Sequence, residues 1–386
     1  MNSLARKIHD AHAVMLKSLG VKLKTREIPR AEDIRASGII QTAGSCTLDN
    51  SLEADFYGTP EKNISYSWDE VPWWRIRDAR LVGDNGQIFL ADGSFLLASV
   101  HPQQNLLHRF KIRRPIRTFE QKLKAPVFHL TGRNHENRGH FLLQHLPRIM
   151  AARALLEKIG DYRILVAPNH ARWQKNMLEL VGFDPARVIE GSQGTISVED
   201  LIYVPHIYGS NALVRPDLCR EICAYAGKVH LPAPVGPPIF ISRQDAPDKK
   251  LLNEPRIIEI AREVLGSLEV IELRKFPLKE QVALYRRAPV IIGAIGQGLC
   301  NVVLTTGRLF ISLKPGLTVS DYFHSGHTTT VANVCGNQAI TFFSNESIRM
   351  RGSWGFPEER FREQLTRLMR APRLKPIVGL LERGRR

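Results

Sequence analysis

The order of apolar and polar positions changes near residue 126 of the chain. Before that point, alternating apolar stretches are separated by turn signals at 84–86 (Asp-Asn-Gly) and 92–93 (Asp-Gly), which are typical of β-hairpins. We therefore expect a β-meander in this segment. Residues 1–20 differ, because apolar side chains recur there about one helical turn apart, which predicts an amphipathic N-terminal helix.

After residue 126, strand-like and helix-like stretches alternate. The first group predicts strand 126–132, helix 139–160, strand 162–168, helix 171–183, short strands near Val188 and Ile202, and helix 219–229. Residues 231–238 follow and are rich in proline, which neither continues a helix nor pairs in the centre of a sheet. This segment is the predicted boundary between two lobes.

The second group repeats the alternation. It predicts strand 238–243, helix 253–266, strand 268–273, helix 278–288, strand 289–293, short helix 299–304, strand 308–313, a helix within 321–335 and strand 338–343. Such apolar strands, separated by helices, indicate a parallel sheet that is covered on both faces. An amphipathic helix at 358–370 is expected to pack back on the first lobe.

These patterns predict an α/β fold with two Rossmann-like lobes, a β-rich N-terminal extension and a C-terminal helix. The predicted segments are an N-terminal helix and β-rich part at 1–125, a first lobe at 126–235, a second lobe at 236–345 and a basic helical tail at 346–386.

The chain is strongly basic, with 54 Lys and Arg against 38 Asp and Glu and a net charge of +16. Such a surface attracts anionic phospholipid, acidic polysaccharide, nucleic acid or a phosphorylated donor in a basic cleft, or it is simply solvated. The N-terminal helix accordingly either packs on the protein surface or docks on an anionic membrane face.

The cysteines and the apolar stretches of the chain bear on metal binding and on cellular location. The 5 cysteines lack metal-ligand spacing, so we expect reduced thiols and no metal site. No stretch approaches about 20 consecutive apolar residues, and charges interrupt the region where a signal peptide needs an apolar core. A cytoplasmic location, peripheral at the inner membrane face if the helix docks there, is therefore predicted.

A glycine-rich turn joins the predicted strand 289–293 to the next helix. Gly293, Gly296 and Gly298 permit close backbone approach, and the helix start presents N–H groups that favour a phosphate. Glycine at such a turn can equally serve packing alone. The spacing also differs from the dinucleotide fingerprint.

A basic loop follows the first strand of the same lobe, where ligands of open α/β sheets collect. Arg243 and Lys250 are candidates to neutralise a diphosphate, although cations in a loop are often just solvated. Asn253 is better explained as the cap of the following helix.

A histidine-rich segment begins the first helix of the first lobe. His140, Gln144 and Arg148 are four residues apart and share one helical face, so we expect them to line one cleft. His140 is the candidate general base for an acceptor hydroxyl. His135 and His145 are better explained as structural histidines.

Four motifs follow one another in the two lobes: GHFLLQHLPR at 139–148, SRQDAPDKKLLNE at 242–254, Glu280-Gln281, and GAIGQGLCN at 293–301. In this order they resemble glycosyltransferase family 61, the group often labelled capsular polysaccharide biosynthesis proteins. The resemblance covers about 132–343.

The resemblance implies the two-lobed GT-B fold, with a nucleotide-sugar donor in the second lobe and the acceptor on the first. It implies a metal-independent, inverting hexosyl or pentosyl transfer to a polysaccharide or lipid-linked glycan, without a cofactor and without nucleic acid as a partner. His140 would be the base. The candidate donor-binding residues are Arg243, Lys250, Gly296, Gln297, Gly298, Leu299, Asn301 and Ser312, and those on the acceptor side or in the cleft are Gln144, His145 and Arg148.

Three positions depart from the family pattern. Ile295 replaces a histidine that suits a phosphate, Gln144 replaces an acidic residue, and Ser312 replaces a glutamate that suits a ribose diol. These changes motivate an alternative, a catalytically degenerate relative that binds a glycan, a polyanion or a partner enzyme. A third hypothesis is an NAD(P)-dependent enzyme. The glycine spacing disfavours it, and Lys314 is the one residue that supports it.

Overall fold

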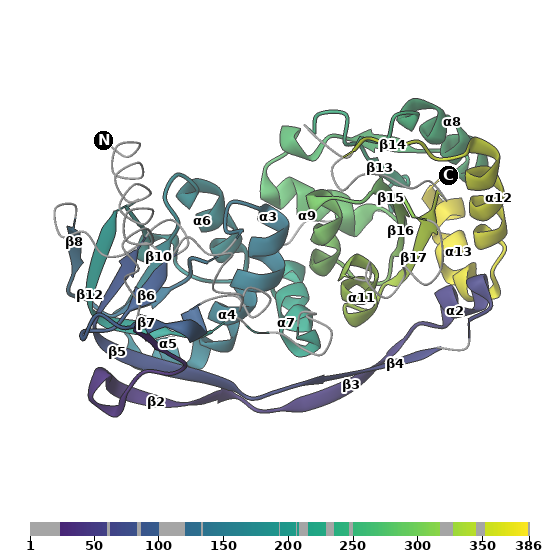
Figure 1. Cartoon of the computed structure of the whole chain (residues 1–386). Coiled ribbons are helices and arrows are strands. Elements are labelled where there is room, and N and C mark those ends of the chain that lie inside the picture. Colours follow the sequence, from purple (N-terminus) through teal and green to yellow (C-terminus); the bar gives the residue numbers. More distant parts are fainter. Residues whose placement is uncertain are drawn as a thin grey trace. The chain divides into compact units, whose positions relative to one another are not determined.

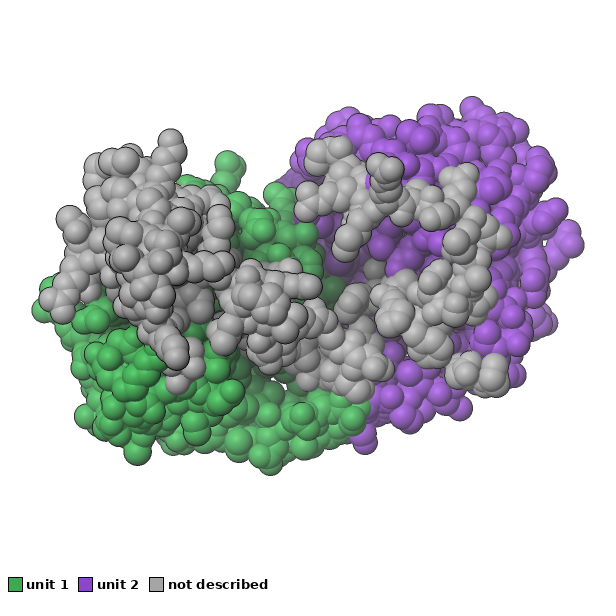
Figure 2. All heavy atoms as spheres, in the orientation of Figure 1, with its two compact units in different colours: residues 1–44, 67–215 green, residues 45–66, 216–386 purple. Residues whose placement is uncertain are grey.

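The chain forms two compact units, residues 1–44 with 67–215 and residues 45–66 with 216–386 (Figure 2). The computed structural model describes residues 24–59, 62–82, 86–99, 120–132, 134–192, 194–205, 207, 215–228, 235–246, 250–316, 327–344 and 352–384. The predicted N-terminal helix at 1–20 lies outside these residues. The four segments proposed from the sequence stay a prediction.

The second unit contains a five-stranded parallel sheet, as the alternation of apolar strands and helices predicted. Its strands lie in the order β14 (Glu269–Ile271), β13 (Ile239–Ile241), β15 (Val290–Ala294), β16 (Leu309–Lys314) and β17 (Gln338–Phe343) (Figure 1). In chain order this is 2-1-3-4-5, so the direction of winding reverses between β13 and β15. A doubly wound sheet binds ligands at such a reversal, beyond the carboxyl ends of the strands.

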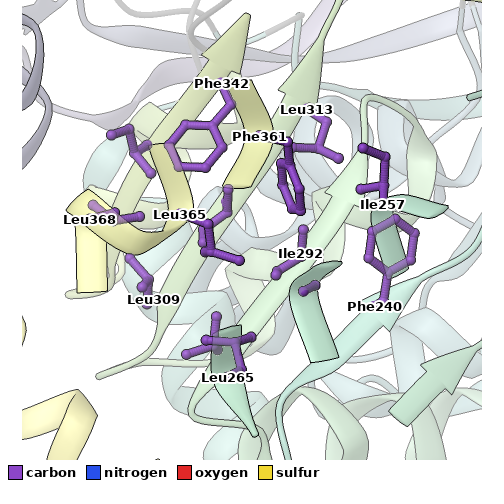
Figure 3. Packing of buried hydrophobic residues seen from close by; sticks show 14 of the residues in the cluster. Phe240, Ile257, Leu265, Ile292, Leu309, Leu313, Phe342, Phe361, Leu365 and Leu368 are labelled. Atoms are coloured by element: carbon purple, nitrogen blue, oxygen red, sulfur yellow. The ribbon is translucent and has the colours of Figure 1, made fainter. Parts of the chain in front are cut away.

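One face of this sheet packs on α8 (Glu254–Leu265) and α12 (Glu358–Met369). Alternate residues of β16, Leu309 and Leu313 among them, join the apolar residues of these helices in one core, as their period of two requires (Figure 3). On the opposite face, Phe310 of β16 stacks on Tyr285 of α9 (Leu278–Arg287).

The expectation that the C-terminal helix packs on the first lobe is wrong. Its apolar stripe, Phe361, Leu365 and Leu368, is buried in the core of the second unit (Figure 3). Arg256 of α8 also donates to Glu358 of α12 at 3.1 Å. Periodicity identifies the apolar stripe of a helix but not the apolar surface on which the stripe packs. A further helix, α13 (Lys375–Gly384), follows it.

A short helix that the sequence did not predict, α2 (Ser51–Tyr57), covers the edge of β17. Thr341 of β17 donates its N–H to Glu53 at 3.0 Å, and its carbonyl accepts from the Tyr57 hydroxyl at 2.5 Å. Strand edges left open invite pairing with other chains, and α2 satisfies this one. The ribbon of β3 (Gly44–Asp49) and β4 (Asn63–Trp68) leads the chain to α2 and back (Figure 1).

The first unit contains a ten-stranded mixed sheet. The predicted meander is confirmed in β5 (Val71–Val82), β6 (Gln87–Phe89) and β7 (Phe95–Leu96), which pair antiparallel. The long strand β12 (Thr195–Tyr203) pairs antiparallel with β5 and parallel with β9 (Val127–His129), so the meander and the parallel strands share one sheet. The other strands are β1 (Thr25–Arg26), β2 (Ile34–Gln41), β8 (Glu120–Leu123), β10 (Arg163–Val166) and β11 (Val188–Glu190).

The single helix predicted at 139–160 is divided into four pieces. They are α3 (Arg138–His140), the π-helix η6 (Phe141–His145), α4 (Leu146–Ala151) and α5 (Arg153–Ile159). The N–H of Leu146 reaches the carbonyl of Phe141, five residues back, and Pro147 has no N–H with which to continue the ladder. The predicted helix at 171–183 is α6 (Ala171–Leu180).

Candidate functional site

The glycine-rich turn and the basic loop meet at the reversal point of the second sheet. Gly296 follows β15 and Arg243 follows β13, the two strands between which the winding reverses. A Cβ atom on Gly296 would lie 1.6 Å from Nη1 and 2.5 Å from Cζ of Arg243. Because the extended backbone of Gly296 suits any residue, glycine is needed here only to leave room for the Arg243 guanidinium. The structure therefore places the Arg243 guanidinium on the turn.

The neighbouring glycines serve the packing of the same turn. A Cβ atom on Gly293 would lie 3.2 Å from the carbonyl oxygen and the Cβ atom of Ile241. One on Gly298 would lie 2.8 Å from Leu273 and 3.1 Å from Ile241. These glycines let η10 (Gln297–Leu304) pack against the end of β13. Packing is the alternative role that the sequence allows for glycine at this turn.

A buried carboxylate, not singled out from the sequence, fixes the Arg243 loop. Glu254 is 1% exposed, accepts from the Ser242 hydroxyl at 2.5 Å and accepts from the Arg243 backbone N–H at 3.2 Å. Burial raises the pKa of this carboxyl, and the hydrogen bonds from Ser242 and Arg243 oppose that shift. The signal was present in the Asn-Glu pair that ends the motif at 242–254.

Two other residues of that motif take backbone partners. Lys250 donates from Nζ to the carbonyl of Gln244 at 2.8 Å. Asn253 occupies the cap position of α8 but makes no side-chain cap bond. Instead it donates to the Phe356 carbonyl at 2.8 Å and accepts from its N–H at 3.0 Å. It therefore anchors the segment that leads to α12.

Side chains of α9 form hydrogen bonds with the glycine-rich turn and with η10. Asn301 donates to Gln281 at 3.0 Å, and Gln281 in turn donates to the carbonyls of Leu273 and Phe276 at 2.9 Å. The Tyr285 hydroxyl donates to the Gly298 carbonyl at 2.6 Å. The amide of Asn301 thus links the glycine-rich motif to the Glu-Gln motif. Of the other candidate donor residues of η10, Gln297 is exposed and Leu299 is buried.

Ser312 lies in the middle of β16, between Gly293 and Thr341 of the neighbouring strands. It is 3% exposed, and no hydrogen-bond partner for its hydroxyl is found among the described residues. Ile295 is half-buried, and its N–H donates to the Leu313 carbonyl at 2.9 Å. Neither side chain supplies a charge at the turn.

In the first unit, His140 and Gln144, which were placed on one helical face by their spacing, contact each other. The ring Nδ1 of His140 lies 3.0 Å from Oε1 of Gln144, and both residues are half-buried. The His140 backbone N–H also donates to Asn137 at 3.2 Å, the cap of α3. With the Gln144 oxygen accepting from Nδ1, the second ring nitrogen of His140 is the basic one.

Arg148 is fully buried and is not presented to solvent together with His140 and Gln144. Its guanidinium donates to the carbonyls of Val204 at 2.8 Å, Thr131 at 3.1 Å and His129 at 3.0 Å. It thereby ties α4 to the ends of β9 and β12. His145 is also fully buried and stacks on Phe141, with 5.8 Å between ring centroids.

His129 lies beside this guanidinium. Burial, and secondarily the Arg148 charge, hold the pKa of His129 well below its usual value. The imidazole is therefore neutral and bonds Thr131 through Nε2 at 2.8 Å. We assign it a structural role.

Residues 139–318 match the family model described as Glycosyltransferase 61. This region belongs to glycosyltransferase family 61. The family indicates a glycosyltransferase, and its region contains His140, Gln144, Arg243, the glycine-rich turn and Ser312. The resemblance drawn from the four motifs is confirmed, whereas the association with capsular polysaccharide stays a prediction.

Other comparisons add little to the glycosyltransferase 61 assignment. None of the curated proteins matches the chain. Among solved structures, the chain is similar to an oxidoreductase from Corynebacterium diphtheriae with 10% identity and a TM-score of 0.25, over 39% of this chain and 98% of that one. A similarity this low carries no argument about fold or function.

Proposed function

We propose that this glycosyltransferase is an inverting, metal-independent enzyme that moves a hexose or pentose from a nucleotide sugar to a polysaccharide or lipid-linked glycan. The observation that carries the proposal is the contact between Arg243 and Gly296 at the reversal point of the second sheet. There the guanidinium lies against the residue that directly precedes η10, and a cation beside the N-terminus of a helix suits an anion.

The donor diphosphate would lie at this position. As the bond from the sugar to the diphosphate breaks, negative charge develops on the departing oxygen. Preorganised donors aimed at that charge stabilise the transition state more than the ground state. Glu254 supports the arrangement because it fixes the backbone of Arg243 without itself reaching solvent.

The acceptor hydroxyl would lose its proton to His140. A single displacement needs a base on the acceptor side, and the hydrogen bond to Gln144 holds the imidazole in the tautomer whose second nitrogen can accept a proton. Gln144 stands where the resemblance places an acidic residue, and its side-chain oxygen orients the ring without adding a negative charge.

We further propose that the two lobes are arranged as in the GT-B fold, with the acceptor on residues 126–235 and the donor on 236–345. No described helix is long and apolar enough to cross a membrane. Peripheral contact of a basic cytoplasmic enzyme with an anionic membrane face stays part of the proposal, supported by the net charge of +16.

A second candidate function is a degenerate relative that binds glycans without transferring sugar. It is favoured by Ile295 and Ser312, which leave the turn without the side chains that suit a phosphate and a ribose. The two functions differ in donor binding, because only the enzyme needs a nucleotide sugar.

The test is calorimetric titration of a panel of nucleotide sugars, followed by transfer assays with the donor that binds. We expect binding by the wild type, loss of transfer in His140→Ala and unchanged donor affinity in that variant. Absence of donor binding by the wild type, or unchanged transfer in His140→Ala, would remove the proposal. Glycan binding that persists without nucleotide binding would favour the second candidate.

A further inference from the structure

Two Asn-His pairs follow adjacent parallel strands of the first unit. Asn134-His135 comes after β9 and Asn169-His170 comes after β10. Both asparagines have a left-handed backbone, with φ of 58° at Asn134 and 67° at Asn169. Asparagine tolerates this region better than most residues, but at an energetic cost, and residues in such conformations cluster at functional sites.

The two loops are held in place by the sheet and by α6. The His135 ring bonds the Gly132 carbonyl at 2.7 Å, and Gln174 of α6 donates to the His135 carbonyl at 3.0 Å. The Asn169 N–H donates to Glu190 at the end of β11. Three neighbouring strands therefore fix this edge, and the His135 and His170 rings lie 5.6 Å apart.

An indole completes this edge. Trp173, in the first turn of α6, is half-buried and lies 6.1 Å from the His170 ring. Its ring meets Phe141 edge-on at 5.2 Å, and the exposed Arg138 places its guanidinium 5.8 Å from the indole centroid. Arg138 and Phe141 lie on either side of His140 in the sequence. The indole therefore contacts residues before and after the candidate base.

The geometry points to Trp173, with His170 and Arg138, as a subsite for a sugar ring of the acceptor. An aromatic face carries negative charge density, which attracts the partially positive C–H groups on the flat side of a pyranose. Arg138, whose guanidinium lies over the indole ring, and His170 beside it add hydrogen-bonding groups next to the indole, as sites with an apolar floor and few polar groups require. The inference rests on the proposed transferase function, since His140 would act on the sugar held there.

Two conservative variants separate recognition from packing. Trp173→Leu keeps an apolar side chain against Phe141 but removes the aromatic face, whereas Trp173→Phe keeps a face. Arg172→Ala, an exposed neighbour on α6, is the matched control. Full-length proteins would be tested on a printed array of neutral and acidic oligosaccharides, and the array oligosaccharide that binds best would then be titrated by calorimetry.

We expect Trp173→Leu to weaken binding of that oligosaccharide at least about fivefold. Trp173→Phe should lie within about threefold of wild type. Arg172→Ala should bind as wild type does, and no variant should change nucleotide-sugar affinity. Equal oligosaccharide affinity in Trp173→Leu and wild type, or no array binding by wild type, would overturn the subsite. Failure of the transferase function would instead appear as absent nucleotide-sugar binding while Trp173-dependent glycan binding persists.

Discussion

Replacing Gly296 by alanine tests the link between the glycine-rich turn and Arg243. The added Cβ atom would lie 1.6 Å from the Arg243 guanidinium, so that group must move. The backbone of Gly296, with φ of 171°, accepts alanine without strain. Since the atom that must yield is the far end of a flexible side chain, the cost in folding stability should stay below about 1 kcal/mol.

The expected loss falls on donor binding. A hydrogen bond between charged groups contributes about 1.5–3 kcal/mol. Displacing the guanidinium from the diphosphate should therefore weaken nucleotide-sugar affinity roughly 10- to 100-fold. Gly298→Ala is the contrasting variant. Its Cβ atom would meet Leu273 at 2.8 Å and Ile241 at 3.1 Å, inside the packed turn. There we expect a loss of stability of about 1–3 kcal/mol.

The assay is a double-mutant cycle of Gly296→Ala and Arg243→Ala. Calorimetry would give donor affinity, and urea unfolding would give stability. If alanine at 296 acts by displacing Arg243, it should cost little affinity once Arg243 is already alanine. Additive losses in the double variant, or wild-type affinity in Gly296→Ala, would refute the reasoning.

Three further predictions concern single side chains. Ser312→Ala should raise stability by up to about 1 kcal/mol in urea unfolding, because it removes a buried hydroxyl that has no hydrogen-bond partner among the described residues. A drop in donor affinity would instead show that Ser312 contacts the donor. Arg148→Lys should lower the free energy of unfolding by roughly 3 kcal/mol in urea unfolding, because one ammonium cannot donate to three carbonyls in this geometry. Unchanged stability with lost acceptor binding would instead show that Arg148 contacts the acceptor. Burial raises the pKa of Tyr203 to about 12, so the folded state favours the neutral phenol and stability should fall as pH rises from about 10 toward 12. Tyr203→Phe should cost about 1 kcal/mol at pH 7 through loss of the bond to Ala98, and its stability should fall less than that of the wild type between pH 10 and 12.

Much of the second unit could be predicted from its sequence. Apolar strands that alternate with amphipathic helices dictate a parallel sheet, and the carboxyl ends of such strands share one edge. That rule predicts that Arg243 and Gly296 lie close together, and the structure shows them in contact. The spacing of four residues placed His140 and Gln144 on one helical face, and in the structure their side chains are in contact.

What the sequence did not reveal depends on distant backbone partners. Arg148 donates to three backbone carbonyls, and a backbone carbonyl is present at every residue, so the sequence does not indicate these partners. Glu254 was overlooked because its partners, Ser242 and the Arg243 N–H, lie across a loop. The seven-residue helix α2 is too short for periodicity to indicate, and its place is set by the edge of β17 nearly 300 residues away.

The central claim is that the donor diphosphate binds at the turn formed by Gly296 and Arg243. A crystal structure with the nucleoside diphosphate of the tightest-binding donor tests it most directly. The account predicts phosphate oxygens within hydrogen-bonding distance of the Arg243 guanidinium and of the N–H groups that begin η10. A nucleotide bound elsewhere, with this turn unoccupied, would contradict it.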